Sequence, residues 1–181
     1  MRFEETLKNS VYEPWESSYI DYAKLKQLLR EDDPAHKAEE WTEDDEGRFV
    51  EELLNVQLEK VNSFQADTYK SLRERTSECE TRLEKLADRE RKDEADGKKG
   101  EGDGNGELKE DSKDIVQELD KITKEINELE KYSRINFTGF LKSAKKHDRK
   151  RGAKYRVRPM LQVRLAALPF NSEDYSPLLY R

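Results

Sequence analysis

The sequence predicts an all-α protein, and three observations support this fold class. Charged residues make up 42% of the 181-residue chain and hydrophobic residues 33%, which suits long helices that bury a single stripe. Only five prolines occur, and three lie beyond residue 158, so helices can run uninterrupted before that point. Apolar residues recur at helical spacing, and no segment indicates a strand. The length fits one domain over residues 1–181.

The N-terminal segment 1–33 is expected to form a helical hairpin. Phe3 begins an apolar stripe at helical spacing, and Pro14 interrupts this first helix. Ser18 and Asp21 have the spacing of a capping box, so we expect them to open the second helix. The apolar stripe of the second helix is Leu25, Leu28 and Leu29.

Two long antiparallel helices are expected next. Thr42 opens a second capping signature, and the helix that follows is predicted over 42–92. A flexible glycine-rich loop is predicted over 93–110, followed by a helix over 111–134 with the spacing of an a/d seam. The seam is Ile115, Leu119, Ile122, Ile126 and Leu129. Because the earlier helix is its natural partner, we expect the chain to be a monomer.

Short C-terminal helices are expected over 136–181. Asn136 is expected to cap the first of them and Gly152 to end it. Pro159 suits the first turn of the next helix, and a final short helix is expected from Ser172.

The sequence argues against several classes of protein. Cys79 is the one cysteine and is expected in the core, and two histidines give no zinc pattern. No apolar stretch of membrane length or signal peptide occurs, so a cytosol-facing location is expected. No catalytic group stands out among the 41 acids, so we expect no enzymatic activity, metal or cofactor. The chain stops at Arg181 without a natural terminus, and we expect it to be a fragment of a longer protein.

Positive charge is concentrated in one segment of an acidic chain. The net charge is −6, yet residues 135–165 hold ten Lys and Arg against one acid, Asp148. That segment therefore carries +9 and the remainder −15. Within it, four cations at positions i, i+3, i+4 and i+7 form one stripe on a helix. They are Lys142, Lys145, Lys146 and Arg149.

Further anion-binding groups are expected near the N-terminus. Tyr22 and Lys26 are four residues apart and share a helix face, whereas Lys24 lies off that face. Arg2 stands beside the N-terminus of the first helix, whose free N–H groups favour anions. Several lysines, in preference to arginines, suit a compact ligand with many phosphates at varied angles. The predicted site is Tyr22, Lys26, Lys142, Lys145, Lys146, Arg149 and Arg2.

Two other functions remain open at this point. The run "KKHDRKRGAKYR" is typical of a nuclear-import, nucleic-acid-binding or protein-binding patch. The remaining charge of −15 would repel a long polyanion, and the stripe lacks interleaved aromatic residues. Alternatively, the seam over 115–129 serves as a coiled-coil scaffold that dimerises.

Three segments resemble the SPX domain family. They are "MRFEETL", "SYIDYAKLKQLL" and "SRINFTGFLKSAKKHDR". The third is the most specific, because it fits the pattern N-[FY]-T-G-F-x-K-x-x-K-K-H-D. The segment "LQVRLAALPFNSEDYSPLLYR" is similar, within that family, to accessory subunits of the fungal vacuolar transporter chaperone (polyphosphate polymerase) complex. The resemblance spans nearly the whole chain apart from the glycine-rich loop.

The resemblance implies an SPX-type helical bundle that senses inositol hexakisphosphate or inositol pyrophosphates and so reports cellular phosphate. It also implies control of polyphosphate synthesis, with other complex subunits as partners at the cytosolic face of the vacuolar membrane. Its phosphate-binding cluster would be Tyr22, Lys26 and Lys142, and its lysine surface cluster Lys145, Lys146 and Arg149. Arg149 stands where the family usually has Lys, and Arg2 replaces the usual Lys or apolar residue.

Overall fold

The structure is a computed structural model that describes residues 2–30, 41–95, 97, 104–151 and 156–168. These residues form helices and contain no strand, which confirms the all-α prediction. They divide into two compact units. Unit 1 holds the described residues up to Asp67 and from Leu129 onward, and unit 2 those from Thr68 to Glu128. Among the described helices, none is long and apolar enough to cross a membrane.

The N-terminal segment forms α1 (Arg2–Ser10), the 3₁₀ helix η1 (Glu13–Ser18) and α2 (Tyr22–Leu28). Asp21 is the N-cap of α2, and its side chain accepts a hydrogen bond from Lys24 N–H at 3.1 Å. The prediction that Ser18 caps this helix is therefore wrong. Ser18 ends η1, and the extended backbone at Tyr19 separates it from α2.

The next helix, α3 (Glu43–Val50), begins at the predicted capping box. Thr42 Oγ1 accepts from Asp45 N–H at 3.2 Å, and the Asp45 carboxylate accepts from Thr42 N–H at 3.0 Å. The chain then passes through a π-helical segment, η2 (Glu51–Gln57), into α4 (Leu58–Ala95). The sequence predicted one regular helix over this stretch. Apolar spacing does not reveal the wider π turn, in which hydrogen bonds run from i to i+5.

The helix α5 (Gly104–Arg151) is continuous, so the prediction of a separate helix capped by Asn136 is wrong. Asn136 is fully buried inside α5. Its Oδ1 accepts from Ile20 N–H at 2.7 Å, and its Nδ2 donates to Tyr132 O at 2.7 Å. The polar residue that resembled a cap therefore makes a long-range contact to the segment before α2.

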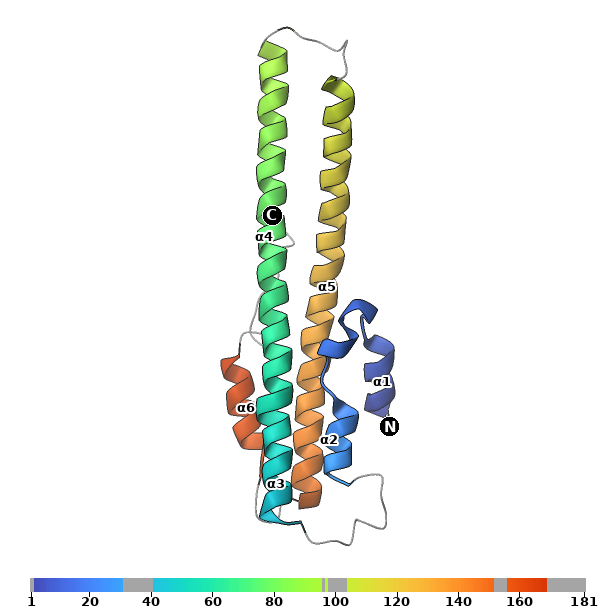
Figure 1. The fold of residues 1–181 in the computed structure, drawn as a ribbon, viewed down its shortest axis with the longest axis vertical. Helices are drawn as coiled ribbons and strands as arrows, with labels where there is room; N and C mark the ends of the chain where they lie inside the picture. The colour runs from blue at the N-terminus through green and yellow to red at the C-terminus, as the bar shows by residue number, and fades with distance from the viewer. Residues whose placement is uncertain (1, 31–40, 96, 98–103, 152–155, 169–181) are drawn as a thin grey trace. The chain divides into compact units, whose positions relative to one another are not determined.

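Within unit 2, α4 and α5 run antiparallel, as predicted (Figure 1). The buried residues of this pair include Leu72, Cys79, Ile115, Ile122 and Ile126. Leu83 lies at helical spacing from Cys79 in the same helix, but it is exposed. Both helices extend into the predicted loop 93–110, since α4 reaches Ala95 and α5 begins at Gly104. Charged residues with good helix propensity, such as Glu94 and Lys109, favour this extension.

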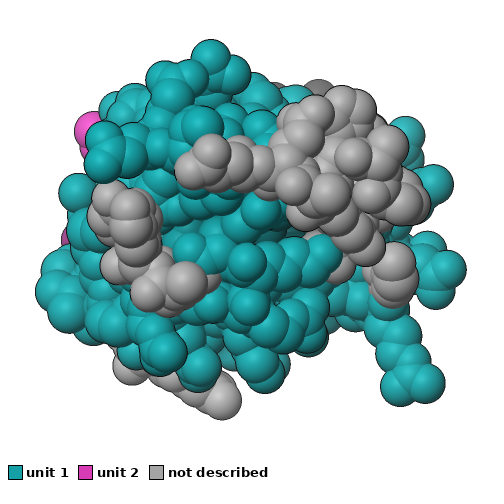
Figure 2. All heavy atoms as spheres, turned by 90° about the horizontal axis from the view of Figure 1, so that it is seen from below, with its two compact units in different colours: residues 1–67, 129–174 teal, residues 68–128, 175–181 magenta. Residues whose placement is uncertain are grey.

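The last described helix, α6 (Arg158–Ala167), has Pro159 in its first turn, as predicted. Gly152 and the helix expected from Ser172 lie outside the described residues. In unit 1, α6 lies beside the start of α4, and α1 and α2 lie beside α5 (Figure 1). Seen from the end at which α5 finishes, the atoms of unit 1 pack closely together (Figure 2).

An aromatic cluster in unit 1 holds η1 against the two long helices. The Trp15 ring lies 5.3 Å from the Phe64 ring of α4, and the Tyr19 ring lies 4.8 Å from the Tyr132 ring of α5. Tyr132 Oη donates to Ser18 O at 2.6 Å. Burial raises the pKa of Tyr132, so its hydroxyl remains a donor. These contacts fix the chain that leads into α2.

Candidate anion-binding site

Four cations form a stripe along the last turns of α5. Lys142, Lys145 and Arg149 are exposed, and Lys146 is half-buried. The buried residues on the other side of this part of α5 include Phe140, Ala144 and His147. The helix is therefore docked, and the cations project from a fixed face. Among the described residues, Lys142, Lys145 and Arg149 have no acidic partner, so their charges are available to an anion from solution.

Two aromatic rings from α1 and α2 lie beneath this stripe. Phe3 and Tyr22 meet edge to face, with ring centroids 5.0 Å apart. Lys142 Nζ lies 5.7 Å from the centroid of Phe3, and Lys146 Nζ lies 5.3 Å from the centroid of Tyr22. An ammonium group within about 6 Å of a ring is attracted to its face. These contacts place Tyr22 and both lysines in one cluster, although they come from opposite ends of the sequence.

Lys26 has a counterion inside the protein. Its side chain is nearly buried, with 5% of the residue exposed, and its Nζ lies 2.9 Å from Glu4 Oε2 of α1. Lys24, which was left out of the predicted site, pairs instead with Glu52 at 3.3 Å. The two neighbouring lysines of α2 therefore have separate partners, as their different helix faces predict.

The remaining predicted residues lie outside this cluster of contacts. Arg2 is exposed at the first position of α1, directly before Phe3. Lys145 and Arg149 are exposed on α5 and extend the stripe past Lys142 and Lys146. Within the described part of the chain, the cations found over the Phe3 and Tyr22 rings are Lys142 and Lys146 and none of these three.

Side-chain amides and a carboxylate fix the start of α2, and with it Tyr22. Asn136 of α5 accepts from Ile20 N–H, and Gln57 of η2 accepts from Asp21 N–H at 2.8 Å. Gln57 Nε2 also donates to Glu52 Oε1 at 2.7 Å, so both ends of this amide are used. Buried polar side chains with complete partners hold a unique geometry, and here they orient the helix that carries Tyr22 and Lys26.

Gly139 allows the N-terminal segment to approach α5 closely. A Cβ atom built at this position would lie 3.0 Å from Ile20 Cγ2 and 3.3 Å from Phe3 Cζ. A glycine in a helix interior is unfavourable by about 1 kcal/mol relative to alanine, so its presence here has a packing reason. Phe3 reaches the position under Lys142 because Gly139 presents no side chain on this surface of α5.

A buried histidine fixes the same part of α5 from its other side. His147 Nε2 lies 2.7 Å from Glu46 Oε2 of α3, and its Nδ1 lies 2.8 Å from Asp148 Oδ1. Its ring stacks on Phe49 at a centroid distance of 4.9 Å. Trp41 Nε1 donates to the same Glu46 oxygen at 2.7 Å. The stripe therefore stands on a helix that hydrogen bonds and stacking tie to α3.

Asp148, the single acid of the basic segment, connects α5 to α6. It accepts from Val157 N–H at 2.7 Å and from Arg158 N–H at 3.0 Å. Burial alone would raise the pKa of the Asp148 carboxyl. The bonds from Val157, His147 and Arg158 outweigh burial, so the pKa lies below its ordinary value. The carboxylate is thus a structural group at the start of α6 and does not neutralise the stripe.

Sequence reasoning missed two residues of the cluster, Phe3 and Glu4. Phe3 was interpreted as a member of an apolar stripe. The edge-to-face contact between its ring and that of Tyr22 cannot be derived from residue spacing. Glu4 is an acid in the first turn of α1, where acids complement the helix dipole. Nothing in the sequence signals that it reaches Lys26. Gly139 did carry a signal, because an isolated glycine inside a helical pattern often marks close packing.

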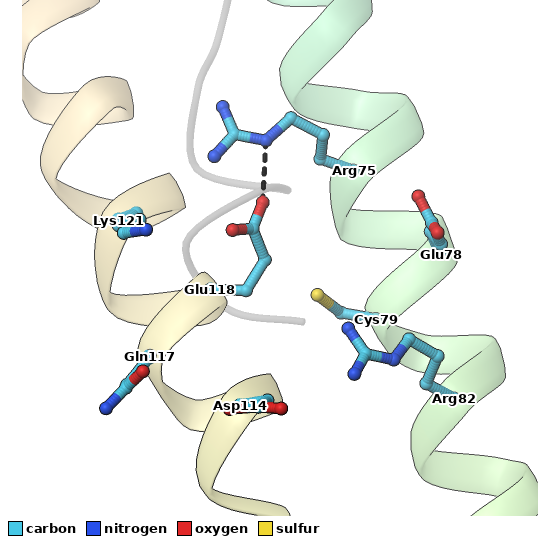
Figure 3. A pocket seen from close by; sticks show the side chains of 8 residues that line it. All are labelled: Arg75, Glu78, Cys79, Arg82, Asp114, Gln117, Glu118 and Lys121. Atoms are coloured by element: carbon cyan, nitrogen blue, oxygen red, sulfur yellow. Dashed lines mark hydrogen bonds and ion pairs between the residues drawn. The ribbon is translucent and has the colours of Figure 1, made fainter. Parts of the chain in front are cut away.

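A pocket of about 400 Å³ in unit 2 is an alternative site (Figure 3). Its lining combines Arg75, Arg82 and Lys121 with Glu78, Asp114 and Glu118, besides Cys79 and Gln117. Arg75 pairs with Glu118 at 2.8 Å and also with Glu125. Burial raises the pKa of the Cys79 thiol, which makes it a poor nucleophile. Because its charges balance, this pocket does not favour a highly charged anion.

Comparisons with known proteins agree on one family. The chain is 41% identical, over its whole length, to vacuolar transporter chaperone complex subunit 2 of Saccharomyces cerevisiae, and covers 20% of that protein. It is 33% identical to SPX domain-containing protein 4 of Arabidopsis thaliana over 76% of this chain and 40% of the relative. No protein-family model matches the chain. It spans about a fifth of the length of the fungal relatives that it matches.

The fold has a solved counterpart. It matches the SPX domain of Chaetomium thermophilum glycerophosphodiester phosphodiesterase 1, which was solved in complex with inositol hexakisphosphate. The TM-score is 0.64, and the match covers 97% of this chain and 90% of the other. At 22% sequence identity, this likeness establishes the arrangement of helices.

Proposed function

Because the chain belongs to the SPX domain family, we propose that it is a receptor for inositol polyphosphates and pyrophosphates. The ligand would bind on the stripe of α5, with Lys142 and Lys146 at its centre and Lys145 and Arg149 beside them. Tyr22 and Lys26 would border the ligand from α2, and Arg2 from α1. The proposed role is regulatory, and any catalysis would belong to other domains or to partner subunits.

The observation that carries this proposal is the meeting of Lys142, Lys146, Phe3 and Tyr22 on one surface. The rings lie against the ammonium groups of both lysines, and Lys142 is exposed and has no acidic partner among the described residues, so its charge is available to phosphates. Charge-assisted hydrogen bonds from ammonium groups to phosphate oxygens are roughly twice as strong as neutral ones. The related SPX domain solved with inositol hexakisphosphate supports this ligand class.

The name of the fungal relatives suggests in which protein complex and at which membrane this receptor acts. We propose that the chain serves a vacuolar transporter chaperone complex and adjusts polyphosphate synthesis to cellular phosphate. Other subunits would be its partners, and the cytosolic face of the vacuolar membrane its location. The isolated chain would be a monomer, because Ile115, Ile122 and Ile126 are already buried within it.

Nucleic-acid binding finds less support in the same geometry. Single-stranded nucleic acids need exposed aromatic faces on which bases stack. Tyr22 is only 3% exposed, and ammonium groups lie over both rings of the cluster. A compact polyanion uses the cations of this surface without needing the rings.

Isothermal titration calorimetry with inositol hexakisphosphate tests the proposed receptor. We expect Lys142→Ala to weaken binding at least tenfold, or about 1.4 kcal/mol, because it removes a central cation. Lys113→Ala is the matched control, since Lys113 is an exposed lysine of the same helix in unit 2. Equal affinities of the two variants would show that the assigned surface is not the binding site.

A further inference from the structure

Lys26, one of the predicted cations, has an acidic partner in the cluster. Its Nζ lies 2.9 Å from Glu4 Oε2, and its side chain is 6% exposed, against 41% for Glu4. An ammonium group this deeply buried needs a counterion, because desolvation disfavours an unpaired charge. The Glu4 carboxylate serves as such a counterion.

Glu4 also lies at the border of the surface that would receive the ligand. It follows Phe3, whose ring lies under Lys142, and it belongs to the first turn of α1. A phosphate that approaches Lys26 meets the carboxylate of Glu4 at the same ammonium group. The ammonium group has three donors, but a phosphate and the Glu4 carboxylate held at the same ammonium group repel each other.

We propose that Glu4 is an internal competitor that lowers the affinity of the site for inositol polyphosphates. This inference rests on the proposed function of the cluster. The Glu4 carboxylate neutralises Lys26 until phosphate displaces it, and its partial exposure gives it room to move away. Glu4 thereby sets the ligand concentration at which the site fills. Its loss makes the receptor respond to less ligand.

The alternative is that Glu4 only ties α1 to α2. Under that alternative, removing its charge loosens α1 and shifts Phe3, so binding weakens. Competition predicts the opposite sign, because the cation becomes available to phosphate. Glu4→Gln separates the two cases, since the amide oxygen still accepts a hydrogen bond from Lys26 while the negative charge is gone.

The test compares Glu4→Gln with Glu5→Gln in the full chain. Glu5 is the next residue of α1, is exposed, and has no partner among the described residues. Both variants change the net charge equally, so a general electrostatic effect appears in both. We expect Glu4→Gln to bind inositol hexakisphosphate about threefold or more tightly than Glu5→Gln does in calorimetry.

A second pair of variants ties the effect to Lys26. In a Lys26→Met background, which keeps the aliphatic stem, we expect Glu4→Gln and Glu5→Gln to bind equally. Thermal unfolding of each variant checks that the fold is intact. Binding by Glu4→Gln that is equal to or weaker than that of Glu5→Gln overturns competition, while wild-type binding keeps the receptor proposal. If neither the wild type nor Glu4→Gln binds the probe, both proposals fail.

Discussion

At the residue scale, one buried imidazole explains why the basic segment contains a histidine and an acid. His147 lies with its ring nitrogens 2.7 and 2.8 Å from oxygens of Glu46 and Asp148. Each ring nitrogen therefore has an acidic side chain within hydrogen-bond distance. His147 and Asp148 therefore hold α5 in place, whereas Lys142 and Lys145 before them are exposed to solvent.

Asp148 makes stability depend on pH in a definite direction. Its pKa in the folded protein lies below the ordinary value of 3.8, so the unfolded chain takes up this proton first as pH falls. The stabilising contribution is complete above about pH 4 and is lost as the pH falls through the folded pKa. Burial opposes this shift, and the hydrogen bonds of Asp148 cause it.

Urea unfolding between about pH 7 and pH 3 measures this contribution. We expect Asp148→Asn to be less stable than the wild type at neutral pH and to lose less stability on acidification. Asparagine keeps an acceptor for Val157 N–H but has no charge to titrate. Parallel stability curves for the two proteins across this range would contradict the expectation.

At the element scale, two glycines in helices predict opposite responses to alanine. Around Gly47 of α3, an added Cβ would meet no atom within 4 Å. Gly47→Ala is therefore expected to raise the free energy of unfolding by about 1 kcal/mol through helix propensity. For Gly139→Ala, the gain in helix propensity is outweighed by overpacking, because forcing a methyl group into a packed contact costs about 1–3 kcal/mol.

We expect Gly139→Ala to lower the free energy of unfolding and to weaken inositol hexakisphosphate binding. The added methyl group displaces Ile20 and Phe3, and Phe3 lies under Lys142. Urea unfolding and calorimetry measure the two effects, with Gly47→Ala as the control. A stabilised Gly139→Ala variant would show that α1 moves away from α5 at little cost.

The elements also show what the sequence could and could not predict. The capping box at Thr42 and the proline start of α6 were predicted correctly, because both signals are local. Asn136 misled the prediction because its partner, Ile20, is distant in the sequence. For the candidate site, helical spacing correctly placed Tyr22 and Lys26 on one face of α2 and the four cations of the stripe on one face of α5. The approach of α1 to α5 depends on tertiary packing, which local spacing does not encode.

At the scale of the whole molecule, ligand binding is expected to stabilise the fold. A ligand that binds only the native state adds about 2.7 kcal/mol to the free energy of unfolding at 100 times its dissociation constant. Thermal unfolding with and without inositol hexakisphosphate measures this gain. Because the contacts are largely exposed ion pairs, we expect raised salt to reduce it. A gain that persists unchanged at high salt would exclude a mainly electrostatic site.

The π-helical segment η2 has a consequence for chain length. A π turn holds about one residue more than an α-helical turn, so the chain could lose one residue from 51–57 and still form an unbroken helix. Because a π turn and an α turn complete nearly the same angle about the axis, the helices on either side of such a deletion would keep their relative facing. Glu46 would then still point toward His147. Homologous chains that keep this histidine–carboxylate contact should therefore tolerate a single-residue deletion within 51–57, whereas a deletion in the α-helical part of α3 beyond Glu46 would turn Glu46 away by about 100°.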